Sequence, residues 1–131
     1  MSTLGASRYV SLTTFRSNGE GVPTPVWVVD AGDELWVTTR LHSHKVARLR
    51  ADPRVTVAEC DIRGGNVGAP VGGSAVVDET AATRARLDAL MEEKYGERFR
   101  ELRAAASARP VKPESVALRI TLDGARDGAS A

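Results

Sequence analysis

The chain is 131 residues long, which suits one domain, and its 18 basic and 17 acidic side chains leave a net charge of +1. This near balance argues against nucleic acid or an anionic membrane as a partner, because both attract proteins through a strong excess of positive charge. The one cysteine cannot form an internal disulfide, the N-terminus lacks a signal-peptide pattern and no apolar run reaches membrane-spanning length, so we expect a cytoplasmic protein.

The first predicted elements form a hairpin. Residues 8–15 alternate between the two faces with the period of a strand, and the Asn and Gly residues of 17–21 favour a turn. The second strand opens with Pro23 and Pro25, which cannot donate ladder hydrogen bonds. This part must therefore be a sheet edge, a strand start or a bulge, where backbone groups stay open to a ligand. Its continuation, residues 26–29, is apolar on both faces and predicts a central strand of a closed barrel or a strand covered by a partner.

A third strand and a short helix follow. Residues 35–39 are aromatic, β-branched or apolar, which favours a half-buried strand. Ser43 has the position of an N-cap, and Val46 and Leu49 lie three residues apart as an apolar stripe. The helix should end shortly before Pro53, because a proline disfavours helical geometry in the residue before it.

Three more strands are predicted at residues 54–60, 71–78 and 116–122, with Val55 and Val57 of the first directed inward. Between the last two strands, residues 80–106 show the 3.6-residue period of helices, which Gly96 divides. Their apolar stripe consists of Leu87, Leu90, Met91, Tyr95, Phe99 and Leu102.

The remaining segments are short. Residues 1–7 form a brief N-terminal segment, Pro110 and Pro113 bracket a linker, and residues 124–131 are small and polar and predict a disordered tail. Six strands with so few helices predict a mainly β fold, a small barrel in a single domain over residues 1–131, because closure removes exposed strand edges.

Basic side chains gather where the third strand ends and the helix begins. The free N–H groups of a first helical turn favour an anion, and Arg40 and Lys45 would add full charges there, with Arg48 as a further candidate. A bound phosphate would explain cations that otherwise oppose the helix dipole. A capped surface helix with solvated charges is the alternative. Thr38 and Thr39 alternate in direction, so only one of them can face a ligand.

Other candidate residues favour structural roles. Trp27 and Trp36 are interpreted as core or subunit interface in preference to stacking on a flat ligand. His42 and His44 have no cysteine or carboxylate at metal spacing nearby, so we interpret them as polar lining and expect no metal site. Neither a G-x-G-x-x-G fingerprint nor a P-loop is present. No nucleophile elbow or paired carboxylates stand out, so no catalytic residue is assigned and a cofactor would supply the chemistry.

A family resemblance rests on several motifs together: YVSLTTF, TPVWVV, LWVTTR, S-x-K followed by V-x-R-L, and DPRVTV. In this combination the chain resembles the flavin/deazaflavin oxidoreductase superfamily of proteins similar to pyridoxamine 5'-phosphate oxidase. It looks most like the branch that uses the deazaflavin coenzyme F420, which is common in actinobacteria. The resemblance covers about residues 8–122.

The resemblance implies a six-stranded split β-barrel of the FMN-binding type with a few peripheral helices. It also implies a homodimer with two cofactor sites at the subunit interface. The residues that match the family's cofactor-binding positions are Pro25, Val26, Trp27, Thr39, Arg40, Ser43 and Lys45. Lys45 and Ser43 match the phosphate-binding S-x-K motif, and residues 25–27 match the strand whose backbone lies along the ring system.

The expected function is hydride transfer between coenzyme F420 and a small, conjugated organic substrate. An FMN-binding oxidoreductase of the same fold is the first alternative, because both cofactors present a phosphate to the same lysine. A cofactor- or haem-binding module without turnover, and an interaction barrel without any small ligand, are the others. The chain lacks the arginine-bearing C-terminal segment with which true pyridoxamine 5'-phosphate oxidases hold their substrate, so that activity is not expected. The N-terminal helix of the family is shortened here, which we expect to leave the substrate side of the groove more open.

Overall fold

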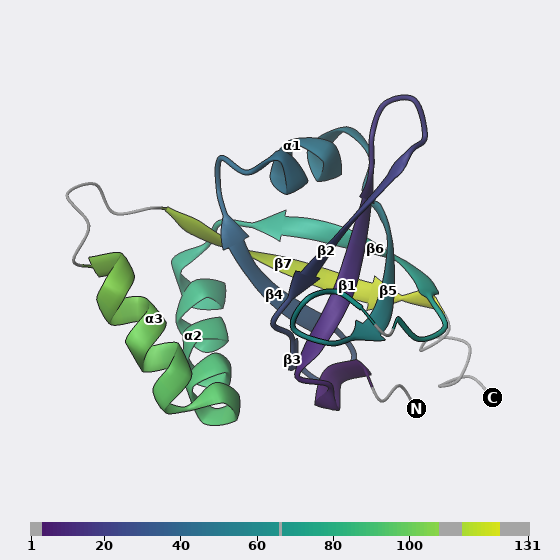
Figure 1. Ribbon diagram of the computed structural model, residues 1–131. Coiled ribbons are helices and arrows are strands. Elements are labelled where there is room, and N and C mark those ends of the chain that lie inside the picture. Colours follow the sequence, from purple (N-terminus) through teal and green to yellow (C-terminus); the bar gives the residue numbers. More distant parts are fainter. Residues whose placement is uncertain (1–3, 66, 108–113, 124–131) are drawn as a thin grey trace.

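The computed structural model describes residues 4–65, 67–107 and 114–123 (Figure 1). Seven strands form one curled sheet, α1 lies across one end of it, and α2 and α3 form a hairpin at its side. The elements are η1 (Leu4–Ala6), β1 (Tyr9–Phe15), β2 (Gly21–Val26), β3 (Val29–Asp30), β4 (Leu35–Arg40), α1 (His44–Ala51), β5 (Arg54–Cys60), β6 (Val71–Asp78), α2 (Ala81–Tyr95), α3 (Glu97–Ser107) and β7 (Ser115–Leu122). The predicted linker between Pro110 and Pro113 and the tail at 124–131 lie outside the described residues.

The sheet curls into a half-barrel (Figure 1). Its strand order is β2-β1-β5-β6-β7-β4-β3, with every neighbouring pair antiparallel. The two edge strands, β2 and β3, are joined by only Trp27 and Val28. Three steps along the backbone span at most about 11 Å. The two edges of the sheet therefore come close together, as the predicted barrel requires.

The prediction of a central strand at residues 26–29 is wrong, and this raises the strand count from six to seven. β2 ends at Val26 and lies at one edge of the sheet, while Val29 begins the two-residue β3 at the other edge. Between them, the Val28 N–H donates to the Tyr95 hydroxyl at 2.9 Å, and the Val28 carbonyl accepts from Lys94 Nζ at 2.6 Å. Helix α2 thus provides the hydrogen-bond partners that a neighbouring strand would have supplied, while the prolines do lie on an edge strand.

The barrel interior is the larger hydrophobic core. Inward-facing residues alternate along each strand, and Val55 and Val57 are buried on β5 as predicted. The cluster consists of Leu4, Val10, Leu12, Val28, Leu35, Val37, Leu49, Val55, Val57, Ala75, Leu118, Ile120 and Leu122. Leu49 belongs to α1, whose buried face therefore covers the end of the barrel.

A second core lies between the helical hairpin and the outer face of the sheet. Leu87, Met91, Tyr95 and Phe99 pack against Trp36 of β4 and Ala117 of β7. Gly96 ends α2 with φ of 60°, a left-handed value that glycine adopts readily, so the predicted division into two helices is confirmed. The predicted stripe ends at Phe99, which is buried in α3, whereas Leu102, its last predicted residue, is 55% exposed.

None of the described helices is both long enough and apolar enough to cross a membrane.

Candidate phosphate-binding pocket

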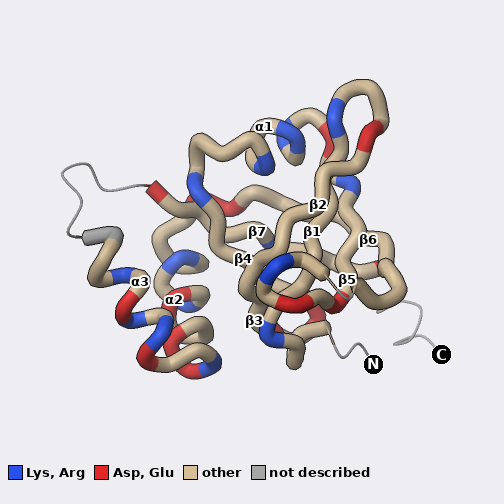
Figure 2. Tube along the Cα trace, viewed as in Figure 1, with Lys and Arg blue, Asp and Glu red and all other residues tan. Residues whose placement is uncertain are grey.

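An open pocket of about 500 Å³ lies where β4 ends and α1 begins. Its lining comes from the end of β4 and the turn after it, from the first two turns of α1, and from the residue before β7. These residues are Arg40, His42, Ser43, His44, Lys45, Arg48 and Glu114. Figure 2 shows the basic residues of α1 and of the end of β4 on the same side of the molecule. The pocket therefore carries three cations and two imidazoles against one carboxylate, a composition that suits an anion.

The turn before α1 is fixed by hydrogen bonds at three points. The Leu41 N–H donates to the Glu114 carbonyl at 2.9 Å, and the Ser43 N–H donates to the Arg40 carbonyl at 3.1 Å. Ser43 is the N-cap, with extended backbone, and its hydroxyl accepts from the Val46 N–H at 3.3 Å. The predicted cap and helix are confirmed, and they hold the side chains of Arg40 and Lys45 at one pocket.

Lys45 and Arg48 provide the positive charge on α1. Burial lowers the pKa of Lys45, and the nearby charge of Arg48 lowers it further. Arg48 Nε donates to Thr14 Oγ1 of β1 at 2.7 Å. Within the described part of the chain, no carboxylate forms an ion pair with Arg40, Lys45 or Arg48. The cations of this pocket are thus available to a ligand.

The seven predicted cofactor-binding residues divide into two groups. Arg40, Ser43 and Lys45 line the pocket together. Thr39 precedes Arg40 on β4 and is half-buried opposite Val116. The remaining three are Pro25, Val26 and Trp27, on or next to edge strand β2.

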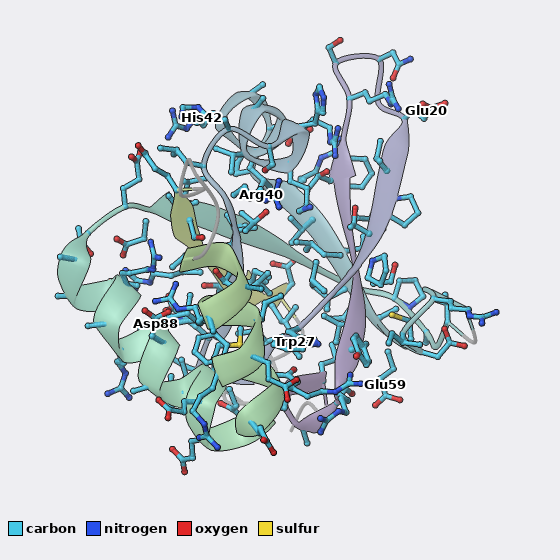
Figure 3. All side chains as sticks on the ribbon, turned by 60° about the vertical axis from the view of Figure 1, so that its left-hand side comes forward. Glu20, Trp27, Arg40, His42, Glu59 and Asp88 are labelled. Atoms are coloured by element: carbon cyan, nitrogen blue, oxygen red, sulfur yellow. The ribbon has the colours of Figure 1, made fainter. Side chains whose placement is uncertain are left out.

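The edge strand does not reach the pocket within one chain. Pro25 pairs with Ser11, and Val26 pairs with Val10 on β1. Trp27 stacks on Tyr95 of α2 with ring centroids 4.3 Å apart and an angle of 9° between the planes. Figure 3 shows Trp27 beside the helical hairpin, away from Arg40 and His42, which lie next to α1. Trp27 is thus half-buried and packs against the helix-covered core, of which Trp36 is a buried member. Both positions agree with the interpretation of the two tryptophans as core residues.

Two residues near the pocket carried no recognisable signal in the sequence. Glu114 follows the predicted linker and reaches the pocket because β7 pairs with β4, with Ser115 opposite Arg40. Thr14 looks like an ordinary strand residue, and its link to Arg48 spans 34 positions. The two histidines do line the pocket, as the interpretation of them as polar lining predicted.

The fold is a split barrel with an open pocket rich in basic residues. The family model for pyridoxamine 5'-phosphate oxidase matches residues 2–127, so the chain belongs to that family.

Several solved structures share the fold at low sequence identity. The haem-storage protein HutZ from Vibrio cholerae is 15% identical with a TM-score of 0.67, and the match covers 92% of this chain and 84% of HutZ. A FAD-binding protein from Mesorhizobium loti is 18% identical with a TM-score of 0.60, covering 92% and 83%. A protein described as an F420 reductase is 18% identical with a TM-score of 0.58, covering 92% and 90%. No curated protein shows significant similarity to the chain. At these identities, the structures establish the fold.

Proposed function

We propose that the chain is an F420-dependent oxidoreductase that transfers a hydride between the deazaflavin and a small, conjugated organic substrate. The observation that carries the proposal is the pocket itself, in which Arg40, Lys45 and Arg48 meet and none of them forms an ion pair with a carboxylate of the described residues. A phosphate at this place would neutralise them. The structural similarity to an F420 reductase supports the choice of deazaflavin.

The residues of the pocket fit a phosphate group. Lys45 is a compact point charge, and Arg40 adds a planar guanidinium at the strand end. The Ser43 hydroxyl already accepts from the helix backbone, and it keeps one proton to donate to a phosphate oxygen. For the rest of the cofactor, we propose Thr39 beside the phosphate and the backbone of Pro25, Val26 and Trp27 along the ring system.

The bound deazaflavin would supply the redox chemistry, and the protein would hold it in place and limit the access of water. With the redox chemistry supplied by the cofactor, the protein would need no nucleophile of its own. No residue of the chain is assigned as the proton donor.

We further propose that the cofactor site is completed in a homodimer. The separation of Pro25 from the pocket supports this, because an edge strand of one copy can lie beside the pocket of another. Sedimentation equilibrium should give twice the chain mass. Co-expression of a Lys45→Ala chain with a Pro25→Asp chain in equal amounts should restore about a quarter of the binding sites, since random pairing makes about half of the dimers mixed and each mixed dimer has one intact site of two. Failure of mixed dimers to restore any site would contradict the shared arrangement.

Titration of the purified protein with F420 and, separately, with FMN tests the cofactor assignment by fluorescence. We expect micromolar or tighter binding of F420. Micromolar binding of FMN with none of F420 would overturn the first choice in favour of a flavin-binding oxidoreductase, an alternative that the similarity to a FAD-binding protein supports.

A binding module without turnover is the other alternative, and the similarity to a haem-storage protein favours it. Steady-state assays with reduced F420 and a panel of quinones, enones and tetrapyrroles separate the two. Oxidation of the coenzyme by any member of the panel supports an enzyme, whereas tight binding without oxidation across the panel supports storage.

A further inference from the structure

Thr14 is a polar side chain inside an apolar barrel. Its relative exposure is 0%, and it faces inward on β1 together with Val10 and Leu12. A buried hydroxyl without a hydrogen bond is costly, and here the partner is Arg48 Nε at 2.7 Å. Because Nε belongs to the rigid, planar guanidinium, this bond fixes the position and restricts the plane of the whole group.

The two terminal nitrogens of Arg48 remain available. In the described ranges 4–65, 67–107 and 114–123, neither Nη1 nor Nη2 has a hydrogen bond or ion pair, although Arg48 lines the pocket. A guanidinium held through Nε and open at both Nη atoms presents a fork of donors. This fork matches two oxygens of one phosphate or carboxylate.

Lys45 and Arg48 are three residues apart on α1, and both line the pocket. Like charges at this spacing destabilise a helix. An anion between them would remove that cost and would be contacted from two sides, by an ammonium group and by a guanidinium.

We propose that Arg48 is a second phosphate-binding residue, that it takes two phosphate oxygens through its terminal nitrogens, and that buried Thr14 is the residue that positions it. The inference rests on the proposed function in that the phosphate belongs to the cofactor. Both a phosphate monoester such as FMN and a phosphate diester such as F420 present at least two non-bridging phosphate oxygens. The shared chemistry is therefore a phosphate group, and separate titrations distinguish its sources.

The test compares ligands with and without the phosphate. FMN is paired with riboflavin, F420 with the corresponding deazariboflavin, and inorganic phosphate serves as a probe that needs no ring system. Arg48→Met removes the fork, Thr14→Val removes only the hydroxyl, and Thr14→Ser restores it. Arg50→Met is the matched control, because Arg50 lies on the same helix but pairs with Glu79 at 2.6 Å and does not line the pocket.

We expect Arg48→Met to weaken binding of the phosphorylated cofactor about 10- to 100-fold, the range for a charge-assisted hydrogen bond, and to leave the unphosphorylated partner within twofold. Thr14→Val should weaken the phosphorylated cofactor by roughly three- to tenfold, with Thr14→Ser and Arg50→Met near the natural protein. A merely structural role for Thr14 would instead weaken both members of a ligand pair equally.

Two results separate failure of this inference from failure of the proposed function. If the natural protein and Arg48→Met bind the phosphorylated cofactor equally while Lys45→Ala loses it, the role of Arg48 is refuted and the cofactor assignment stands. If the natural protein binds neither cofactor, the proposed function fails, and calorimetry with inorganic phosphate decides the inference alone. Phosphate binding that Arg48→Met weakens and Arg50→Met does not would support it; no phosphate binding, or equal binding by all variants, would overturn it.

Discussion

The basic residues of the pocket differ from several of those beside the helical hairpin in their protein partners. On the side of the helical hairpin, Arg119 pairs with Glu34 at 3.0 Å and Asp78 at 3.3 Å, and Arg103 pairs with Asp88. Lys94 donates to the carbonyls of Gly5, Ser7 and Val28 at 2.6–2.9 Å. On the side of α1, Arg40, Lys45 and Arg48 share a pocket without an ion pair among the described residues.

The difference indicates that basic side chains serve the fold on one side and a ligand on the other. Paired cations on the helical side hold neighbouring elements together: Arg119 joins β7 to β6 and to the residue before β4, and Arg103 joins α3 to α2. Unpaired cations around the pocket contribute no such bond apart from Arg48 to Thr14, and their mutual repulsion works against folding. Residues that oppose stability while lining a pocket are expected where a ligand binds. The following predictions test this contrast.

Lys45→Ala should have the largest effect, and chiefly on binding. We expect the affinity for the phosphorylated cofactor to fall by about 1.5 to 3 kcal/mol, because a hydrogen bond to a charged group is lost. Fluorescence titration measures it. If the chain were an interaction barrel without a small ligand, this variant would change surface charge alone, and an unchanged cofactor affinity would refute the phosphate assignment.

Tyr95→Phe should act on the opposite side and on stability. The Tyr95 hydroxyl accepts from the Val28 N–H and lies within 2.9 Å of the carbonyls of Arg8 and Val28, to one of which it donates. Its removal leaves buried backbone groups unpaired, so the free energy of unfolding in urea should fall by roughly 1 to 3 kcal/mol. Affinity for inorganic phosphate should not change.

Tyr9→Phe is the matched control for that variant, since no hydrogen bond to the Tyr9 hydroxyl is found in the described part of the chain. It should change stability by about 0.5 kcal/mol or less. Equal losses in the two variants would show that the link between Val28 and α2 is not what closes the barrel.

Acid should weaken the paired side first. Hydrogen bonds from Thr80, with smaller contributions from Thr83 and Arg119, lower the pKa of Asp78 to about 2. Because the folded pKa lies below the unfolded value of about 4, the carboxylate stabilises the fold above that value, and this contribution is lost as the pH falls from about 4 to 2. Asp78→Asn should remove roughly 1 to 2 kcal/mol at neutral pH and flatten the decline over that interval.

Unfolding curves recorded from pH 5 to pH 2 measure this dependence. The pKa of Glu34 is also lowered, chiefly by its hydrogen bond from Arg119. Part of the loss of stability in acid should therefore remain in Asp78→Asn. A decline in Asp78→Asn as steep as in the natural protein would contradict the role of Asp78.

Local chemistry explains what could be predicted from the sequence. The periods of the strands other than residues 26–29, the Ser43 cap and the break at Gly96 depend on neighbouring residues, and they are confirmed. Arg40, Ser43 and Lys45 lie within six positions of one another, so their meeting at one pocket was visible in the pattern.

Long-range contacts explain what could not be predicted. The strand predicted at residues 26–29 fails because Val28 finds its partner in Tyr95, 67 positions away. Thr14 and Arg48 meet only because α1 packs over β1, and Glu114 joins the pocket only through the pairing of β7 with β4. Neither relation has a periodic signal. In the proposed homodimer, the position of edge strand β2 relative to the pocket of the other copy would depend on how the two chains assemble. The pattern of neighbouring residues in one chain does not predict that.

The smallest predicted effect is a change in the free energy of unfolding, and whether this energy rises or falls is what tests the contrast. Lys45→Met keeps the apolar stem, removes an unpaired charge next to Arg48, and should raise the free energy of unfolding of the ligand-free protein by about 0.5 kcal/mol at low salt. Arg50→Met on the same helix removes an exposed partner of Glu79 and should lower it by about 0.5 kcal/mol or less. Urea unfolding without phosphate in the buffer compares them directly. If the free energy of unfolding rises in Lys45→Met and falls in Arg50→Met, then on this one short helix Arg50 stabilises the fold and Lys45 serves a ligand. If it falls in both variants, the stability argument for an anion at the pocket is removed.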